Sequence, residues 1–244
     1  MGSESFSVTI LGCDGSFPGP GGACSGYLIR GGKTNIWLDA GSGTMSNLQR
    51  HVRLEDIDAV VITHQHPDHW SDLDGLAVAF KWALGLPGPL VYAPEGVRDL
   101  MRVGDAADVF RWHEIYERSV VSVGDMKASF SRTDHSVPTF GVRIEYLSRN
   151  LGYSADTGPA WRLSALGSDL DLALCEASFL ADREGTVQHM SGRQAGASAL
   201  EAGVGRLVIT HLIPGTDRTA ARLEAEESFG GPVEVATIGA RFEV

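Results

Sequence analysis

The stretch T-H-Q-H-P-D-H-W, residues 63–70, decides the fold of this chain, because it gathers three imidazoles and a carboxylate over six consecutive positions. It follows the apolar run A-V-V-I at residues 59–62, which is typical of a buried strand. Burying so many polar and ionisable groups at the end of such a strand costs free energy unless a partner binds them. The stretch therefore predicts a bound group at this point of the fold.

The residue types in this stretch favour a metal ion as that group. His64 and His66 are two residues apart in a segment that leaves a strand, so their rings can project to the same side. Pro67 biases His66 away from helical backbone geometry and fixes the turn into Asp68 and His69. Imidazole nitrogen and carboxylate oxygen suit zinc and related cations. A polar loop with surface histidines is the alternative, and the density of donors argues against it.

Length and composition set the broad class of the protein. The chain has 244 residues, of which 43% are hydrophobic, and we expect one domain over residues 1–244. It has no apolar run of the ~18–20 residues that a membrane span needs, and its start resembles no secretion signal. Cys13, Cys24 and Cys175 form no C-x-x-C pair, so we expect free thiols in a reducing cytoplasm.

The charge balance limits the class of partner. Lys and Arg number 20 and Asp and Glu number 31, which gives a formal net charge of −11. A large nucleic acid would be repelled unless the basic residues gathered on one face. The charge therefore argues against a large nucleic-acid partner and leaves a small nucleotide open.

Hydrophobic patterning predicts a layered α/β fold in which strands and helices alternate along most of the chain. Strands are predicted at residues 6–11, 27–29, 35–38, 60–63, 90–92, 127–132, 139–146, 151–154, 170–175, 206–210 and 233–236. Helices are predicted at residues 41–50, 71–84, 160–166, 191–202 and 219–229. We expect Ser71 to cap the second helix, and Trp70, Phe80 and Trp82 to pack it. A Ser191-x-x-Gln194 capping box opens the fourth helix.

Three further candidates lie beside predicted strands, at the edge where α/β folds usually assemble their sites. His135 precedes one strand, Asp156 follows another, and His211 ends a strand that echoes the one before His64. Each of them alone could be an ordinary hydrogen-bonded or capping residue. Together with the first cluster they supply the remaining ligands of a site for two metal ions.

One more histidine, His189, stands outside this set and directly before the capped helix. A near-neutral pKa makes an imidazole a natural proton donor, so His189 is a candidate general acid. The alternative is a loop residue without a chemical role.

The ordered set of histidines and aspartates resembles the metallo-β-lactamase superfamily. The resemblance implies a four-layer αβ/βα sandwich with a dinuclear metal centre at one edge. It implies two divalent cations, Zn²⁺ with Mn²⁺ as the alternative, and Asp156 as the ligand that bridges them. One cation would take His64, His66 and His135, and the other would take Asp68, His69 and His211.

Within the superfamily, the ribonuclease Z-like phosphodiesterases are similar to this chain in two segments. These segments are Glu176-Ala177-Ser178-Phe179 and His189-Met190-Ser191, and Ala155 replaces the glycine that usually precedes the bridging aspartate. The resemblance implies that Asp68 orients or deprotonates the attacking water and that His189 protonates the leaving group. Glu176 would either orient His189 or serve as a buried structural acid.

The resemblance also points to the substrate class. Enzymes that process tRNA 3′ ends commonly insert a long arm between the third histidine and the bridging aspartate, but predicted strands fill most of residues 136–155 here. The segments T-I-L-G-C at residues 9–13 and S-G-Y-L at residues 25–28 resemble short actinobacterial cyclic-nucleotide phosphodiesterases. We therefore expect a dinuclear phosphodiesterase that acts on a small nucleotide such as 3′,5′-cyclic AMP.

Other functions remain open on the sequence alone. One is an arm-less ribonuclease Z-like nuclease that trims tRNA 3′ ends, and another is a lactone or thioester hydrolase, because the same ligands serve acyl substrates. A third is a metal-bound regulatory module without catalysis, which the complete set of ligands and the spare acid His189 argue against. Relatives of this branch are often dimers, so the resemblance also allows a homodimer.

Overall fold

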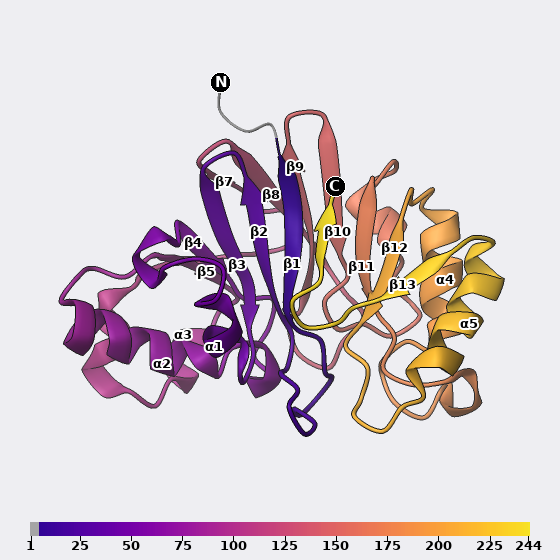
Figure 1. Cartoon of the computed structure of the whole chain (residues 1–244), viewed down its shortest axis with the longest axis horizontal. Helices are drawn as coiled ribbons and strands as arrows, with labels where there is room; N and C mark the ends of the chain where they lie inside the picture. Colours follow the sequence, from indigo (N-terminus) through magenta and orange to yellow (C-terminus); the bar gives the residue numbers. More distant parts are fainter. Residues whose placement is uncertain (1–4) are drawn as a thin grey trace.

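Two β-sheets pack face to face, and helices cover the outer face of each, in the computed structural model of the chain, which describes residues 5–244 (Figure 1). The first half of the chain builds most of one sheet with its helices, to which the C-terminal strand β14 is added, and residues 120–235 build the other. The predicted four-layer αβ/βα sandwich is therefore confirmed.

The first sheet has the strand order β14-β1-β2-β3-β4-β5-β6. Strands β14, β1, β2 and β3 pair antiparallel, whereas β3 to β6 run parallel. The bounds are β1 Phe6–Gly12, β2 Gly26–Gly31, β3 Thr34–Ala40, β4 Ala59–Val61, β5 Leu90–Ala93, β6 Arg111–Glu114 and β14 Arg241–Glu243.

The second sheet has the order β13-β12-β11-β10-β9-β8-β7 and the same mixed pattern. Strands β7 to β10 pair antiparallel, and β10 to β13 run parallel. The bounds are β7 Val120–Val123, β8 Met126–Arg132, β9 Phe140–Tyr146, β10 Arg149–Tyr153, β11 Leu172–Glu176, β12 Leu207–Thr210 and β13 Val233–Val235.

The helices divide between the two outer faces (Figure 1). On the first sheet lie α1 Thr44–Leu48, α2 Asp72–Val78 and α3 Val97–Leu100, and on the second lie α4 Gly192–Glu201 and α5 Arg218–Phe229. Within residues 5–244, every helix is too short or too polar to cross a membrane.

Alternation of side chains along the strands gives the sandwich three apolar layers. In β3, Ile36 and Leu38 face the layer between the sheets, whereas Trp37 faces the layer under α1 and α2. In β11, Leu174 faces the layer between the sheets and Cys175 faces the layer under α4 and α5. Both sheets are thus buried on two faces, and polar residues gather at the edge where the parallel strands end.

Each predicted strand overlaps an observed one, but the structure adds three. Strands β6, β7 and β14 are short, lie at the edges of their sheets and expose much of their surface, so they carry little apolar alternation. Residues 111–114 include Trp112, in a stretch that the sequence left unassigned.

Two predicted helices differ from the observed structure. The segment predicted as a helix at residues 160–166 contains only the 3₁₀ turn Leu163–Leu166. The helix predicted at residues 71–84 continues from α2 as a π-helix, Ala79–Leu84. Phe80 is buried, whereas Trp82, two residues further along and so on the opposite side of the helix, is 70% exposed, against the expectation that Trp82 packs the helix.

The prediction that Ser71 caps α2 was also wrong. Its backbone is helical, with φ −57° and ψ −25°, and its hydroxyl makes no capping bond. The 3₁₀ turn Pro67–His69 leads almost directly into α2, so the chain has no extended residue at which a serine could cap. The Ser191 capping box of α4 is confirmed, with both reciprocal hydrogen bonds present.

Helices α4 and α5 approach closely because α4 presents glycines to α5, and this contact generates a stability prediction. A Cβ at Gly196 would lie 2.3 Å from the carbonyl oxygen of Ala225, a backbone atom that cannot move aside without shifting the helix. We expect Gly196→Ala to destabilise the protein by about 1–3 kcal/mol in urea unfolding, despite the better helix propensity of alanine. Gly231→Ala is the control, because a Cβ there meets only the Phe229 ring at 3.7 Å. Equal stability of the two variants would contradict the prediction.

Candidate metal centre

Every predicted ligand lies at one edge of the sandwich, where strands of both sheets end. His64, His66, Asp68 and His69 follow β4, and His135 lies between β8 and β9. Asp156 follows β10, and His211 follows β12. These side chains form two groups that share Asp156, and within each group the candidate ligand atoms lie within 4.8 Å of one another.

The first group consists of His64, His66, His135 and Asp156. Nδ1 of His66 lies 3.2 Å from Nε2 of His64 and 3.1 Å from Nε2 of His135. Oδ2 of Asp156 lies 3.6 Å from Nε2 of His64. Four atoms around a tetrahedral Zn²⁺, with bonds of ~2.0–2.1 Å, stand ~3.3 Å apart. The spacing of this group fits that arrangement.

The second group consists of Asp68, His69, Asp156 and His211, all buried. Nε2 of His69 lies 3.2 Å from Oδ1 of Asp156 and 3.5 Å from Oδ2 of Asp68. Nε2 of His211 lies 3.4 Å from Oδ2 of Asp156. The two carboxylate oxygens of Asp156 thus face histidines of both groups.

Buried polar atoms without hydrogen bonds test whether a cation fits. Among the described residues, Nε2 of His69, Nε2 of His211 and Oδ1 of Asp156 are buried and make no hydrogen bond. All three point into the cluster, and leaving such atoms unpaired in a dry site is costly. A cation would satisfy them together, so the two groups could hold a pair of divalent cations with Asp156 shared.

The outer nitrogens of the histidines are held by other groups, which aims the inner nitrogens at the centre. Nδ1 of His211 lies 2.8 Å from Oγ of Ser25, and Nδ1 of His64 lies 3.1 Å from Oγ1 of Thr63. Nδ1 of His135 lies 3.3 Å from the carbonyl oxygen of Gln188. Each ring is therefore fixed in orientation, and the Gln188 carbonyl, which can only accept, also favours the proton of His135 on Nδ1.

Asp39, at the end of β3, is a buried carboxylate that the sequence analysis missed. It accepts hydrogen bonds from the Thr63 amide at 2.8 Å and from the Tyr153 hydroxyl at 3.0 Å. Nδ1 of His69 lies 2.7 Å from its Oδ2. An acidic residue directly after a buried strand and before a glycine at position 41 was the available signal.

The backbone around the centre is strained at three positions. Asp39, Ala155 and His211 have φ angles of 53°, 52° and 56°, in the left-handed region that favours glycine. Each costs about 1–2 kcal/mol, which the surrounding hydrogen bonds and packing must offset. This explains physically why a glycine is usual where Ala155 stands.

Asp68 reaches the centre from the 3₁₀ turn and is fixed by a second loop. Its Oδ2 accepts a hydrogen bond of 2.8 Å from the amide of Ser16, in the glycine-rich loop after β1. Burial raises the pKa of Asp68, but the neighbouring His69 and His211 outweigh burial and bring that pKa below its ordinary value. The carboxylate is therefore ionised at neutral pH.

His189 and Glu176 form a pair beside the two groups. Nδ1 of His189 lies 2.9 Å from Oε1 of Glu176, and the His189 ring centre lies 5.2 Å from that of His135. Burial disfavours the charged imidazole, but the charge of Glu176 and the hydrogen bond to it raise the pKa of His189 to about 9. At neutral pH the His189 ring is thus a positively charged imidazolium, and its Nε2 lies on the side opposite Glu176.

Glu176 is fully buried and holds more than His189. It accepts hydrogen bonds from the Thr157 amide at 2.7 Å, from the Ser178 hydroxyl at 2.7 Å and from the Met190 amide at 3.2 Å. Of the two roles left open by the sequence, orienting His189 and serving as a structural acid, the geometry is compatible with both at once.

Comparison with known proteins identifies the family. A family model described as the beta-lactamase superfamily domain matches residues 34–212. The chain belongs to the metallo-β-lactamase superfamily. It is 34% identical to an uncharacterized protein of Mycobacterium tuberculosis, over 98% of this chain and 93% of the relative.

Two further relatives carry names that describe an activity. The probable metallo-hydrolase YhfI of Bacillus subtilis is 31% identical, over 96% of this chain and 98% of the relative. Its crystal structure superposes with a TM-score of 0.89, covering 99% of this chain and 100% of that one. A ribonuclease Z of Mycolicibacterium paratuberculosis is 28% identical, over 94% of this chain and 95% of the relative. By family, the chain is therefore a metallo-hydrolase.

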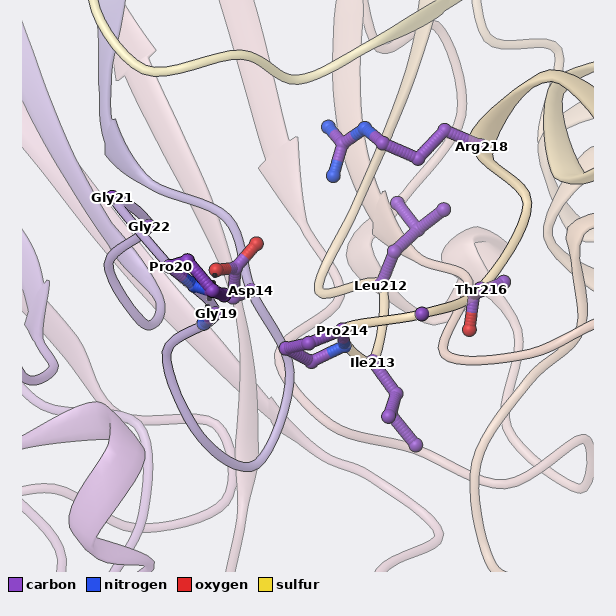
Figure 2. Close-up of a pocket in the computed structure, with 11 residues that line it drawn as sticks. Asp14, Gly19, Pro20, Gly21, Gly22, Leu212, Ile213, Pro214, Thr216 and Arg218 are labelled. Carbon is purple, nitrogen blue, oxygen red and sulfur yellow. Dashed lines mark hydrogen bonds between the residues drawn. The ribbon is translucent and has the colours of Figure 1, made fainter.

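A separate cavity of about 280 Å³ lies beside the segment that follows His211 (Figure 2). Asp14, Gly19 and Gly22 of the glycine-rich loop line one side, and Thr216 and Arg218 line the other. Asp14 accepts the amide of Gly19, and Arg218 donates to the carbonyl oxygen of Ala236, so both charged groups stabilise loops. The predicted site residues lie outside its walls.

The position of Asp39 generates a prediction about metal affinity. We expect Asp39→Asn to weaken divalent-metal binding about 10- to 100-fold, because His69 loses the charge that orients its ring. Competition with a chromogenic chelator measures this affinity. Asp58→Asn is the matched control, since Asp58 likewise accepts a backbone amide, that of Asn35, but is distant from the ligands. Equal affinities in two variants with wild-type circular dichroism would disprove the role of Asp39.

Proposed function

We propose that the protein is a dinuclear metal phosphodiesterase that hydrolyses a small nucleotide, with 3′,5′-cyclic AMP as the expected substrate. The observation that carries this proposal is the position of His189, which is held by Glu176 beside the two ligand groups. An alkoxide leaves with difficulty from a phosphodiester, so a proton donor at this place suits the reaction.

The ligands are proposed as the sequence assigned them, with Asp156 bridging. Histidine-rich donor sets favour zinc, with manganese as the alternative. Two divalent cations bound there would lower the pKa of a water molecule and neutralise charge that develops on the phosphoryl oxygens.

Residues of the chain then handle the protons. Asp68, fixed by the Ser16 amide, orients the attacking water and accepts its proton as the new oxygen–phosphorus bond forms. His189 donates its proton to the 3′ oxygen as the bond from phosphorus to that oxygen breaks. Glu176 holds the His189 ring in position, so that its Nε2 carries the proton that is transferred. The product is a single molecule, a nucleoside 5′-monophosphate with a neutral 3′ hydroxyl.

Two observations support a small substrate over tRNA. Strands β9 and β10 form a tight hairpin, with Tyr146 paired to Arg149, in the segment where an arm would be inserted. The net charge of −11 also opposes a polyanion. An arm-less tRNA 3′ nuclease is the second candidate, because a relative at 28% identity is named a ribonuclease Z.

An acyl substrate, such as a lactone or thioester, is a weaker proposal. A lactone or thioester needs less help from a general acid, because the leaving thiolate is stable and the tethered alkoxide can be held by a cation. The Glu176 and His189 pair would then have no clear use.

The proposed activity leads to a direct test. We expect metal-replete protein to convert 3′,5′-cyclic AMP to 5′-AMP, and Asp68→Ala to lower turnover at least ~100-fold, because water loses its proton acceptor and one ligand is lost. Chromatography resolves 5′-AMP from the 3′ isomer. If protein with two bound metals forms neither product but trims pre-tRNA 3′ ends, the nuclease candidate replaces this one.

The role of His189 is tested separately. We expect His189→Ala to lower kcat for cyclic AMP ~10²- to 10⁴-fold while the metal content, measured by elemental analysis, stays at the wild-type level. His113→Ala provides the control, because His113 is exposed and stacks on Tyr92, away from the ligands. Loss of metal in His189→Ala would instead identify His189 as a ligand, and unchanged kcat would remove it from the mechanism.

A further inference from the structure

A cavity of about 320 Å³ opens at the same edge of the sandwich, one strand further along from the metal centre. It is lined by residues that follow β5 and β6 in the first sheet and by the ends of β8 and β9 in the second. Its volume is at the lower end of the range for small-molecule pockets.

One loop belongs to both the metal centre and the cavity. The loop between β8 and β9 carries His135 in its middle and contributes Pro138 to the cavity, and Arg132 at the end of β8 lines the cavity as well. The amide of Thr133 donates to the carbonyl oxygen of Thr139 at 2.9 Å and closes the base of this loop. The loop that positions His135 therefore also forms part of the cavity wall.

Two hydrogen bonds also connect the segment around His64 and His66 to the cavity. Gln65 stands between the candidate ligands His64 and His66, and its Nε2 donates to the carbonyl oxygen of Glu95 at 2.8 Å. The amide of Phe140 donates to the carbonyl oxygen of Thr63 at 3.2 Å. Segments that carry candidate ligands are thus hydrogen-bonded directly to segments that line the cavity.

The walls of the cavity suit a flat heteroaromatic ring. Pro94, Ile115, Pro138 and Phe140 give an apolar lining, and Tyr116 adds an aromatic ring that is 54% exposed. The Tyr116 hydroxyl donates to Glu114 and its amide donates to Oγ of Ser119, which fixes the residue at the rim. An exposed aromatic ring held in this way offers a surface on which a base can stack.

Two acidic residues line the cavity, and they differ in their contacts. The Glu117 carboxylate accepts a hydrogen bond from the backbone amide of Arg132 and so holds the loop. Glu95 is exposed, and it is its backbone carbonyl that accepts a hydrogen bond from Gln65. A carboxylate acceptor in an apolar pocket matches an amino group on the edge of a ring.

We propose that this cavity, from Pro94 to Phe140, is the subsite for the nucleobase of an amino-purine nucleotide, with the ring against Tyr116 and its amino group directed to Glu95. The proposal rests on the proposed phosphodiesterase function and deepens it by assigning the base. It accounts for selectivity at a centre whose ligands contact only the phosphate.

Binding of adenosine to metal-replete protein, followed by NMR titration, tests the subsite without any phosphate. We expect saturable binding that weakens about 10-fold or more in Tyr116→Ala. Trp82→Ala is the matched control, because Trp82 is another exposed aromatic residue, on the π-helix outside the groove. Purine riboside, which lacks the amino group, should bind more weakly than adenosine to wild-type protein, and the two should bind alike to Glu95→Ala.

Hydrolysis of a base-free substrate, methyl riboside 3′,5′-cyclic phosphate, separates this proposal from the proposed function. We expect slower hydrolysis than for cyclic AMP, with the same kcat/KM in wild type and Tyr116→Ala. If adenosine binding depends on Tyr116 but neither phosphate is hydrolysed, the subsite stands and the phosphodiesterase proposal fails. If both phosphates are hydrolysed equally well and adenosine does not bind, the subsite is disproved. Equal weakening of adenosine binding in Tyr116→Ala and Trp82→Ala disproves it as well.

Discussion

The hydrogen bonds to the buried carboxylate of Asp39 are the interactions on which the centre depends, because they join the two sheets at the place where the ligands converge. Asp39 leaves the first sheet at the end of β3, and Tyr153 at the end of β10 in the second sheet donates to it. The same carboxylate holds the amide of Thr63 and the ring of His69. A buried carboxylate without donors would be costly, but these donors satisfy it and leave it no freedom to move. The candidate ligands from β4 and from β10 therefore keep a fixed relative position.

The strained backbone follows from this geometry. Side chains that leave parallel strands normally diverge, and the site needs them to turn inward over a short distance. Asp39, Ala155 and His211 achieve this turn with positive φ angles at the strand ends. Such strain persists only where packing and hydrogen bonds over-determine it, and all three residues are buried. The fold thus supplies the rigidity that keeps the ligand atoms of His69, His211 and Asp156 3.2–3.4 Å apart.

Much of this arrangement could be predicted from the sequence, and the part that could not has identifiable causes. The ligand candidates were found because imidazoles and carboxylates after apolar strands are conspicuous, and His189 because it precedes a capping box. Asp39 was missed because one acidic residue after a strand reads as a turn residue, and its role appears only when Tyr153 arrives from a distant strand. The strands β6, β7 and β14 were missed because these short edge strands expose much of their surface and carry little alternation of apolar and polar residues. The π-helix is invisible to a pattern method, since one extra residue in a turn leaves no mark on composition.

The electrostatics around the centre constrain how a substrate could be selected. Arg193, in the first turn of α4, forms an exposed ion pair with Glu184. Its charge is therefore already paired. Affinity for an anionic phosphate would then come chiefly from bound cations, which attract any phosphate alike. Selection among phosphates has to come from the part of the molecule that lies beyond them. In the proposed subsite, lined by Pro138 and Tyr116, that part of the molecule is the base of the nucleotide.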